Sequence, residues 1–168
     1  RHGRCCRFDE NDARALGRTA SGVRGINIDE DDEVIGMIAY DPTAEDAQAH
    51  SLLVVSEHGY GKRSDFDEYR KTNRGGKGVK TLNITEKTGE LVAMKNVTDE
   101  NDLMIINRSG ITIRMAVADI KVAGRATQGV KLINIKDGDS IAAISAVNKS
   151  EEETSDQQAE PAQEQTNE

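Results

Sequence analysis

Basic residues recur at fixed spacing along this 168-residue chain, and their side chains could bind phosphate groups. The members of the three series are Arg7, Arg63 and Arg114; Arg18, Arg74 and Arg125; and Arg24, Lys80 and Lys131. In every series, successive members lie 56 and 51 residues apart. Cations at equivalent positions of successive units would neutralise DNA phosphates and release their counterions. The spacing therefore predicts a positive stripe that binds DNA, to which Lys62 and Lys77 also belong.

Such a stripe favours contact with the DNA backbone, and bending of the duplex, over the reading of bases. Stacking on single strands is a weak option, because only 3% of the residues are aromatic and none is Trp. The competing interpretation is that the arginines are solvated or bond to loop carbonyls. The sequence pattern leaves both interpretations open.

The cations belong to a repeat that must position them. A Gly-Val pair begins four residues after each Arg of the second series, and an Ile/Leu-Asn-Ile triplet begins eight residues after it. A Gly also lies four residues before each Arg of the first series, at Gly3, Gly59 and Gly110. Three copies with the same offsets indicate a repeat protein.

Short apolar runs with turn residues between them predict strands and no dominant helix. We expect hairpins at 52–55 with 60–63 and at 103–106 with 111–114, third strands at 79–84 and 130–135, and fourth strands at 91–97 and 141–147. Four strands per unit are typical of radial blades. The predicted fold is all-β, with the last two to three four-stranded blades of a β-pinwheel or propeller-like array.

The expected organisation has four parts. They are the end of a truncated blade at 1–28, a blade at 29–84, the final blade or blades at 85–149, and a disordered acidic tail at 150–168. Because the chain starts within a patterned segment and without Met, we expect further blades upstream.

The formal charge of −8 hides an uneven distribution. Residues 150–168 hold seven acidic and no basic residues, and 29–33 hold five more acidic residues in a row. A segment of the first kind cannot bury enough apolar area to fold, so it should be disordered. Outside both clusters, 22 basic residues face 18 acidic ones. The body is therefore mildly basic, and the net charge does not exclude DNA as a partner.

No constellation of residues predicts catalysis, a metal site or a bound cofactor. The histidines are scattered, and the glycines of 75–78 lack the Ser/Thr and helix that a nucleotide-binding loop requires. Cys5 and Cys6 are adjacent, so we expect reduced thiols in a strand and no zinc site. No apolar run approaches the length of a membrane-spanning helix.

Several motifs resemble the C-terminal domain of DNA gyrase A, a component of a bacterial type IIA topoisomerase. The stretch 57–63, Glu-His-Gly-Tyr-Gly-Lys-Arg, followed by Glu68-Tyr69, is similar to a family motif, as are 17–26 and 124–130. Arg74-Gly75-Gly76-Lys77-Gly78 matches the end of the gyrase A box, but Thr72 and Asn73 replace its first two residues. The resemblance covers about residues 1–147.

The resemblance implies a β-pinwheel that wraps duplex DNA on its basic rim and supports ATP-dependent negative supercoiling. It implies as partners the rest of the gyrase A protein and the gyrase B protein in an A2B2 heterotetramer, in the bacterial cytoplasm. ATP and magnesium would serve other parts of that enzyme, since this chain has no counterpart of its catalytic residues. The alternatives are the equivalent domain of the A protein of topoisomerase IV and a propeller that scaffolds proteins.

The acidic tail predicts a measurable effect on DNA binding. Deleting 150–168 changes the formal charge from −8 to −1 and removes a competitor for the basic stripe. We expect the shortened chain to bind duplex DNA more tightly at low salt in a fluorescence anisotropy titration. Equal affinity with and without the tail would contradict the prediction.

Overall fold

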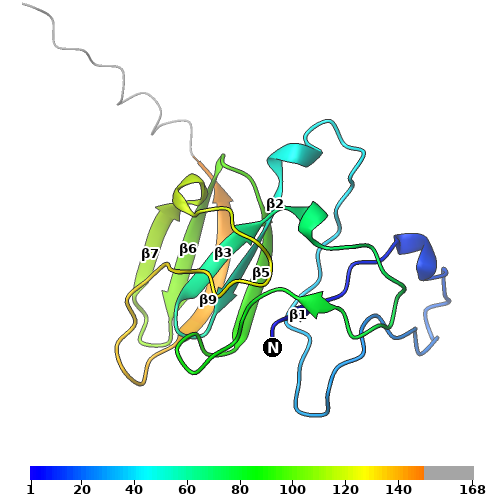
Figure 1. Ribbon diagram of the computed structural model, residues 1–168, viewed down its shortest axis with the longest axis horizontal. Helices are drawn as coiled ribbons and strands as arrows, with labels where there is room; N and C mark the ends of the chain where they lie inside the picture. Colours follow the sequence, from blue (N-terminus) through cyan, green and yellow to red (C-terminus); the bar gives the residue numbers. More distant parts are fainter. Residues whose placement is uncertain (150–168) are drawn as a thin grey trace, which may run out of the picture.

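The computed structural model describes residues 1–149, so the predicted disordered tail at 150–168 lies outside the described residues. Antiparallel strands dominate the described chain, as predicted (Figure 1). The strands are β1 (Arg4–Cys5), β2 (Ser51–Ser56), β3 (Tyr60–Ser64), β4 (Val79–Lys80), β5 (Leu91–Val97), β6 (Asn101–Asn107), β7 (Thr112–Ala116), β8 (Val130–Lys131) and β9 (Ile141–Asn148). The helices are four short 3-10 turns, η1 (Glu10–Asp12), η2 (Ala47–Ala49), η3 (Phe66–Glu68) and η4 (Val117–Asp119). Within 1–149, no helix is long and apolar enough to cross a membrane.

The two predicted hairpins form as expected. Strands β2 and β3 pair around Gly59, and β6 and β7 pair around Gly110; both glycines have positive φ, of 82° and 86°. Only a residue without Cβ adopts this conformation at little cost. Each predicted fourth strand pairs with the first strand of its hairpin, β5 with β2 and β9 with β6.

The predicted third strands differ from expectation in both length and partner. Strands β4 and β8 have two residues each, where six were expected, because the chain then turns inward to bury Leu82 and Ile133. Each pairs with the hairpin strand of the preceding unit: β4 with β1, and β8 with β3. The four-stranded sheet β5-β2-β3-β8 therefore takes strands from both sides of the boundary expected at 84.

Central strand β2 is buried on both faces, and this creates two cores. Leu53 and Val55 face a core that they share with Leu103 and Ile105 of β6. On the other face, the alternate residues Leu52 and Val54 pack with η3 and Leu82 in a second core. Full burial of such a side chain contributes about 1.5–3 kcal/mol. The middle sheet thus joins the first and last units into one body, with two sheets side by side in Figure 1.

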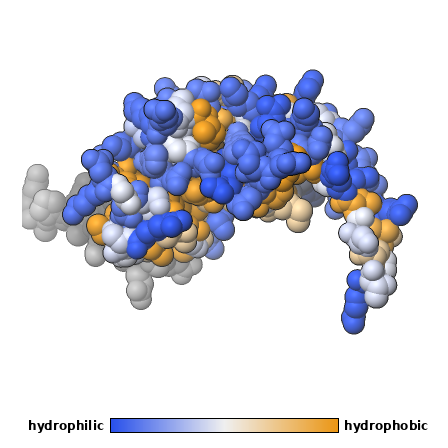
Figure 2. Space-filling model, turned by 90° about the horizontal axis from the view of Figure 1, so that it is seen from below, coloured by the Kyte–Doolittle hydropathy of each residue, from blue (hydrophilic) through white to orange (hydrophobic). Residues whose placement is uncertain are grey.

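The segment 34–40 occupies the place of a fourth strand in the first unit, but it forms no strand. In the later units this strand pairs with the strand before the hairpin glycine, whereas no strand of residues 1–149 pairs with 34–40. Its apolar residues Ile35, Ile38 and Tyr40 still pack on the second core, where Tyr40 stacks on Phe66. Val34 and Met37 are 63% and 89% exposed. Hydrophobic patches also interrupt the otherwise hydrophilic face in Figure 2.

Two segments that we call the first strap (70–78) and the second strap (121–129) link the units. Each begins after a 3-10 turn and follows the outer edge of the preceding hairpin, where Thr72 and Ala123 donate backbone hydrogen bonds of 2.8 Å to Arg7 and Arg63. Figure 1 shows the second strap, in yellow, leading from η4 across the sheet. The straps thus cover sheet edges that would otherwise present unpaired backbone groups.

Each strap ends on a glycine that touches the hairpin strand beside it. Gly78 and Gly129 have φ of 68° and 81°, and a Cβ atom on them would lie 2.4 Å from the oxygen of Cys5 and 2.5 Å from that of Gly61. The short pairings β1–β4 and β3–β8 therefore depend on the absence of a side chain at these positions.

Lys62 of β3 is buried beneath the second strap, with 1% of its surface exposed. Its Nζ donates hydrogen bonds to the carbonyl oxygens of Gly124, at 2.7 Å, and Arg125. Burial is the main cause that lowers the pKa of Lys62 to about 8; the nearby Glu68 opposes the change, and Arg125 contributes to it. Lys62 is thus an internal tie between a hairpin and the strap that covers it.

We predict that Gly129→Ala destabilises the chain more than Gly138→Ala. Both glycines have positive φ, of 81° and 83°, so both variants incur the backbone cost of about 1–2 kcal/mol. Only at Gly129 does the new methyl group also meet backbone, since nothing lies within 4 Å of the Gly138 position. Urea unfolding measures the difference, and equal losses would contradict the close approach.

We predict that stability gains a component from Lys62 as the pH rises from 8 to 10.5. Over this range the unfolded chain, with an ordinary lysine pKa of 10.5, binds a proton that the native Lys62, with a pKa of about 8, has released. The native state is therefore favoured as pH increases, by about 1.4 kcal/mol per unit of pKa difference. Urea unfolding at several pH values should show a steeper rise for the native sequence than for Lys62→Met. Parallel curves would show that Lys62 titrates normally.

Candidate nucleic-acid interface

One of the three predicted series lies fully on the surface. Arg24, Lys80 and Lys131 are exposed, and we call them the rim row. Lys80 and Lys131 occupy equivalent positions in β4 and β8, opposite Arg4 and Tyr60. Lys80 Nζ donates a hydrogen bond of 3.2 Å to Asn83, whereas the side chains of Arg24 and Lys131 have no hydrogen bond or ion pair within 1–149. The rim row presents one cation per unit to solvent.

Lys77 of the first strap is also exposed, and the structure places Arg4 beside it. The Arg4 guanidinium donates to the carbonyl oxygens of Lys77 and Gly78 at 3.0 and 3.3 Å. Arg4 and Lys77 line a shallow hollow of about 200 Å³ together with Asp29 and Asp32. The predicted acidic cluster at 29–33 therefore adjoins the cations of the first unit.

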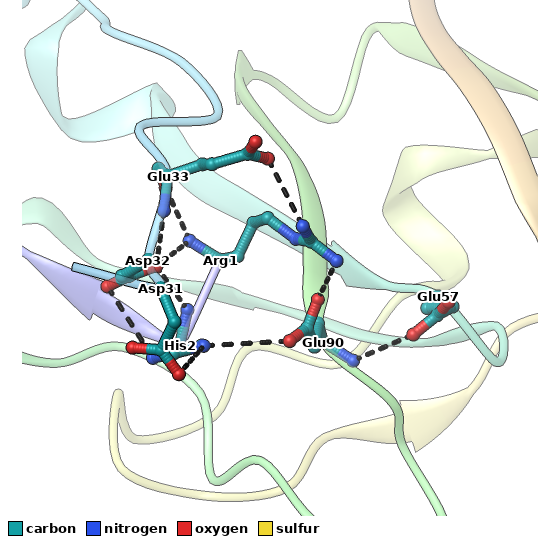
Figure 3. A network of polar contacts seen from close by, with 7 residues as sticks. All are labelled: Arg1, His2, Asp31, Asp32, Glu33, Glu57 and Glu90. Atoms are coloured by element: carbon teal, nitrogen blue, oxygen red, sulfur yellow. Dashed lines mark hydrogen bonds and ion pairs between the residues drawn. The ribbon is translucent and has the colours of Figure 1, made fainter. Parts of the chain in front are cut away.

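The acidic cluster is fixed by the first residues of the chain, as Figure 3 shows. Asp32 Oδ1 accepts hydrogen bonds from the terminal ammonium of Arg1 at 2.7 Å and from the backbone N–H of His2 at 2.9 Å. Burial raises the pKa of Asp32, but these bonds and that from Glu33 N–H outweigh it and keep the pKa at about 2. Glu33 and Glu90 also form ion pairs with the Arg1 guanidinium. Asp32 is thus ionised at neutral pH.

In the first series, Arg7 and Arg63 bond to backbone carbonyl oxygens of the next unit, whereas Arg114 is exposed. Arg7 donates to the carbonyl oxygens of Phe66 and Tyr69, at 2.7 and 3.0 Å, around η3 of the next unit. Arg63 makes the equivalent contact with Ile120 after η4, at 2.9 Å, and pairs with Asp99. Arg114, in the last unit, is exposed and bonds to Asp102 at 2.7 Å.

Two of the predicted DNA-binding residues, Lys62 and Arg63, are buried. Lys62 and Arg63 are 1% and 7% exposed, and their donors are aimed at backbone carbonyls of the next unit. A duplex cannot reach these groups without displacing the second strap or η4. We leave both out of the candidate interface.

Two members of the second series, Arg74 and Arg125, are half-buried. Arg74 donates to the carbonyl oxygens of Asp12 at 3.0 Å and Arg24 at 2.6 Å, and Arg125 donates to that of Lys80 at 2.8 Å. Arg18, the first member, is exposed and has no polar partner within the described chain. For Arg74 and Arg125, the interpretation that the arginines bond to loop carbonyls is correct.

A fourth repeated cation was missed in the sequence. Arg14, Arg70 and Lys121 share the same spacing, and all three are exposed. The spacing alone could have found this series, because its offsets are 56 and 51 residues, as in the others. Arg4 could not have been found in this way, since Tyr60 and Ile111 occupy the equivalent positions.

Tyr69, Cys5 and Cys6 are packed against other parts of the protein. Tyr69 is buried and its hydroxyl bonds to Thr81, and burial raises its pKa. Burial also raises the pKa of the Cys5 thiol to about 11, while Cys6 Sγ contacts Thr72. Within residues 1–149, no group of three or more His, Cys, Asp or Glu side chains could bind a metal ion.

Comparison with known proteins identifies the family. The family described as DNA gyrase C-terminal domain, beta-propeller, matches residues 1–41, 50–98 and 101–148. DNA gyrase A of Staphylococcus epidermidis is 46% identical over 151 residues, which cover 90% of this chain and 16% of the relative. DNA gyrase A of Staphylococcus aureus MRSA252 is 45% identical over 159 residues, which cover 94% and 18%. The chain thus spans less than a fifth of the length of these relatives.

Solved structures share the fold. The DNA gyrase A C-terminal domain superimposes with a TM-score of 0.72 at 24% identity, over 83% of this chain and 45% of that chain. The C-terminal domain of DNA topoisomerase IV superimposes with a TM-score of 0.75 at 19% identity, over 88% and 44%. With the repeated strands, strand exchange between units and extensive sequence identity all in agreement, this chain belongs to the family of DNA gyrase C-terminal β-propeller domains.

Proposed function

We propose that the chain is a DNA-wrapping module of DNA gyrase A, which binds and bends duplex DNA. The observation that carries the proposal is the rim row, in which Lys80 and Lys131 are exposed at equivalent places in β4 and β8 and Arg24 is exposed at the same repeat spacing. Repetition of the cation with the blade gives a track along which successive phosphates can be neutralised. Arg18 and Lys77 add exposed positive charge near the first unit.

The wider assignment follows from the relatives, which are named as the A component of DNA gyrase. On that basis the chain works with the remainder of the gyrase A protein and with the gyrase B protein, in an A2B2 assembly in the bacterial cytoplasm. Other parts of the assembly supply the cleavage chemistry and bind ATP and magnesium. The role of this module is to bend the duplex during ATP-dependent negative supercoiling.

The A protein of topoisomerase IV is the second candidate, favoured by the similar superposition on the C-terminal domain of that enzyme. The naming of the more identical relatives favours gyrase. An assay with the full-length parent and its partner protein separates the two: gyrase adds negative supercoils to relaxed plasmid with ATP, whereas topoisomerase IV chiefly unlinks catenated circles. A propeller that scaffolds proteins would bind no duplex at any salt concentration.

We predict that Lys80→Ala with Lys131→Ala weakens duplex binding and reduces its dependence on salt. Each lost phosphate contact lowers the slope of log affinity against log salt by about 0.9, so the double variant should lose about 1.8. The matched control is Arg108→Ala with Lys136→Ala, which removes two exposed cations outside the repeated series. Fluorescence anisotropy over a range of salt concentrations gives both quantities. If the control loses as much slope as the rim-row variant, the rim row is not the binding track.

A further inference from the structure

Each junction between units is tied by two arginines that reach in opposite directions. At the first junction Arg7 reaches forward to Phe66 and Tyr69, and Arg74 reaches back to Arg24. At the second, Arg63 reaches forward to Ile120 and Arg125 reaches back to Lys80. All four guanidinium groups donate to backbone carbonyl oxygens. We call Arg7, Arg63, Arg74 and Arg125 the clamp arginines.

The two backward arginines bond to the backbone of the rim row itself. Arg74 bonds to the carbonyl oxygen of Arg24, and Arg125 bonds to that of Lys80. In each case the side chain of the bonded residue carries the exposed cation of the preceding unit. The backward arginines therefore join one strap directly to the cation position before it.

Backbone hydrogen bonds reinforce these links. Gly75 N–H donates to Gly25 at 2.8 Å and Asn27 N–H donates to Gly76 at 2.9 Å, while Asn83 N–H donates to Thr127 at 3.1 Å. Each strap thus lies against the segment that carries the preceding rim cation. The bonds between each strap and the preceding unit therefore help to fix the spacing between rim cations, in addition to the sheets.

We propose that Arg74 and Arg125 are positioning residues that set the spacing of the rim row and so the bend of the bound duplex. The inference rests on the proposed function, and it assigns these arginines a role other than phosphate contact. Smooth bending of DNA costs free energy, so a protein can impose a bend only if its own contact points are held apart rigidly. An arginine suits this role because its planar fork presents several donors in fixed directions, whereas lysine offers a flexible point charge.

Substitution of Arg125 by lysine and by alanine distinguishes a positioning residue from a residue that contacts phosphate. Arg125→Lys keeps the charge but cannot reproduce the guanidinium geometry, and Lys131→Ala is the matched comparison that removes a rim cation. The probe is a duplex labelled at both ends, in which energy transfer reports the bend and anisotropy reports affinity at several salt concentrations. Arg74→Lys repeats the test at the other junction, should Arg125→Ala fail to fold.

We expect Arg125→Lys and Arg125→Ala to reduce the bend alike, with a salt slope equal to that of the native chain. Lys131→Ala should instead lower the slope by about 0.9. The proposal is overturned if Arg125→Ala lowers the slope as Lys131→Ala does and Arg125→Lys restores it, because that pattern identifies a phosphate contact. It is equally overturned if both arginine variants bend DNA as the native chain does.

A measurement without DNA separates this proposal from the proposed function. Hydrogen exchange of the Asn83 amide should accelerate in Arg125→Lys and Arg125→Ala, because the bond to Thr127 opens when the strap loosens. If exchange accelerates but the native chain binds no duplex, the proposed function fails, whereas the role of Arg125 in holding the strap stands. If the native chain binds and bends duplex while exchange at Asn83 is unchanged in both variants, the clamp fails and the proposed function stands.

Discussion

The structure depends on one interaction, in which a unit covers the outer edge of strand β1 or β3 of the unit before it. A two-stranded hairpin leaves a row of unpaired N–H and C=O groups, which is costly to bury and prone to aggregation when exposed. Here β4 covers β1 and β8 covers β3, and a strap continues along each edge. The contact is close enough that Gly78 and Gly129 leave no room for a Cβ atom. No unit is complete by itself, so the units fold as a continuous array.

This exchange of strands also decides what the repeated basic residues do. Backbone carbonyl oxygens of one unit meet basic side chains of its neighbour at each junction, where the clamp arginines donate hydrogen bonds between units and Lys62 donates to the second strap. Lys80 and Lys131, which follow the straps, are exposed to solvent. Equal spacing in sequence therefore conceals two kinds of cation. One kind stabilises the array, and the other presents charge to a partner.

The difference between the sheets follows from their neighbours. The sheet β5-β2-β3-β8 has a covered edge and a core on each face, and every residue of β2 and β3 is buried. Within residues 1–149 the sheet β7-β6-β9 contributes to the first core only, and Ile106 of β6 is 39% exposed. The extent to which a strand is buried therefore depends on the place of its unit in the array.

Much of the fold could be read directly from the sequence, because hairpins, turn glycines and repeat spacing depend on neighbouring residues. The all-β class, both hairpins, the fourth strands at 91–97 and 141–147 and the family resemblance were predicted and are confirmed. The series of cations was also visible, although Arg14, Arg70 and Lys121 were overlooked. The domain boundaries and the DNA contacts of the rim row remain predictions.

Only the tertiary structure decided which cations face solvent. Arg63, Arg74 and Lys80 follow the same repeat spacing, yet Arg63 is buried, Arg74 is half-buried and Lys80 is exposed. The carbonyl partners of Arg63 and Arg74, Ile120 and Arg24, lie 57 and 50 residues away in a neighbouring unit. Strand exchange brings those groups together, and no local pattern records it. The sequence by itself determined that charge repeats with the blades, and the packing of the blades determined which charges are left for a ligand.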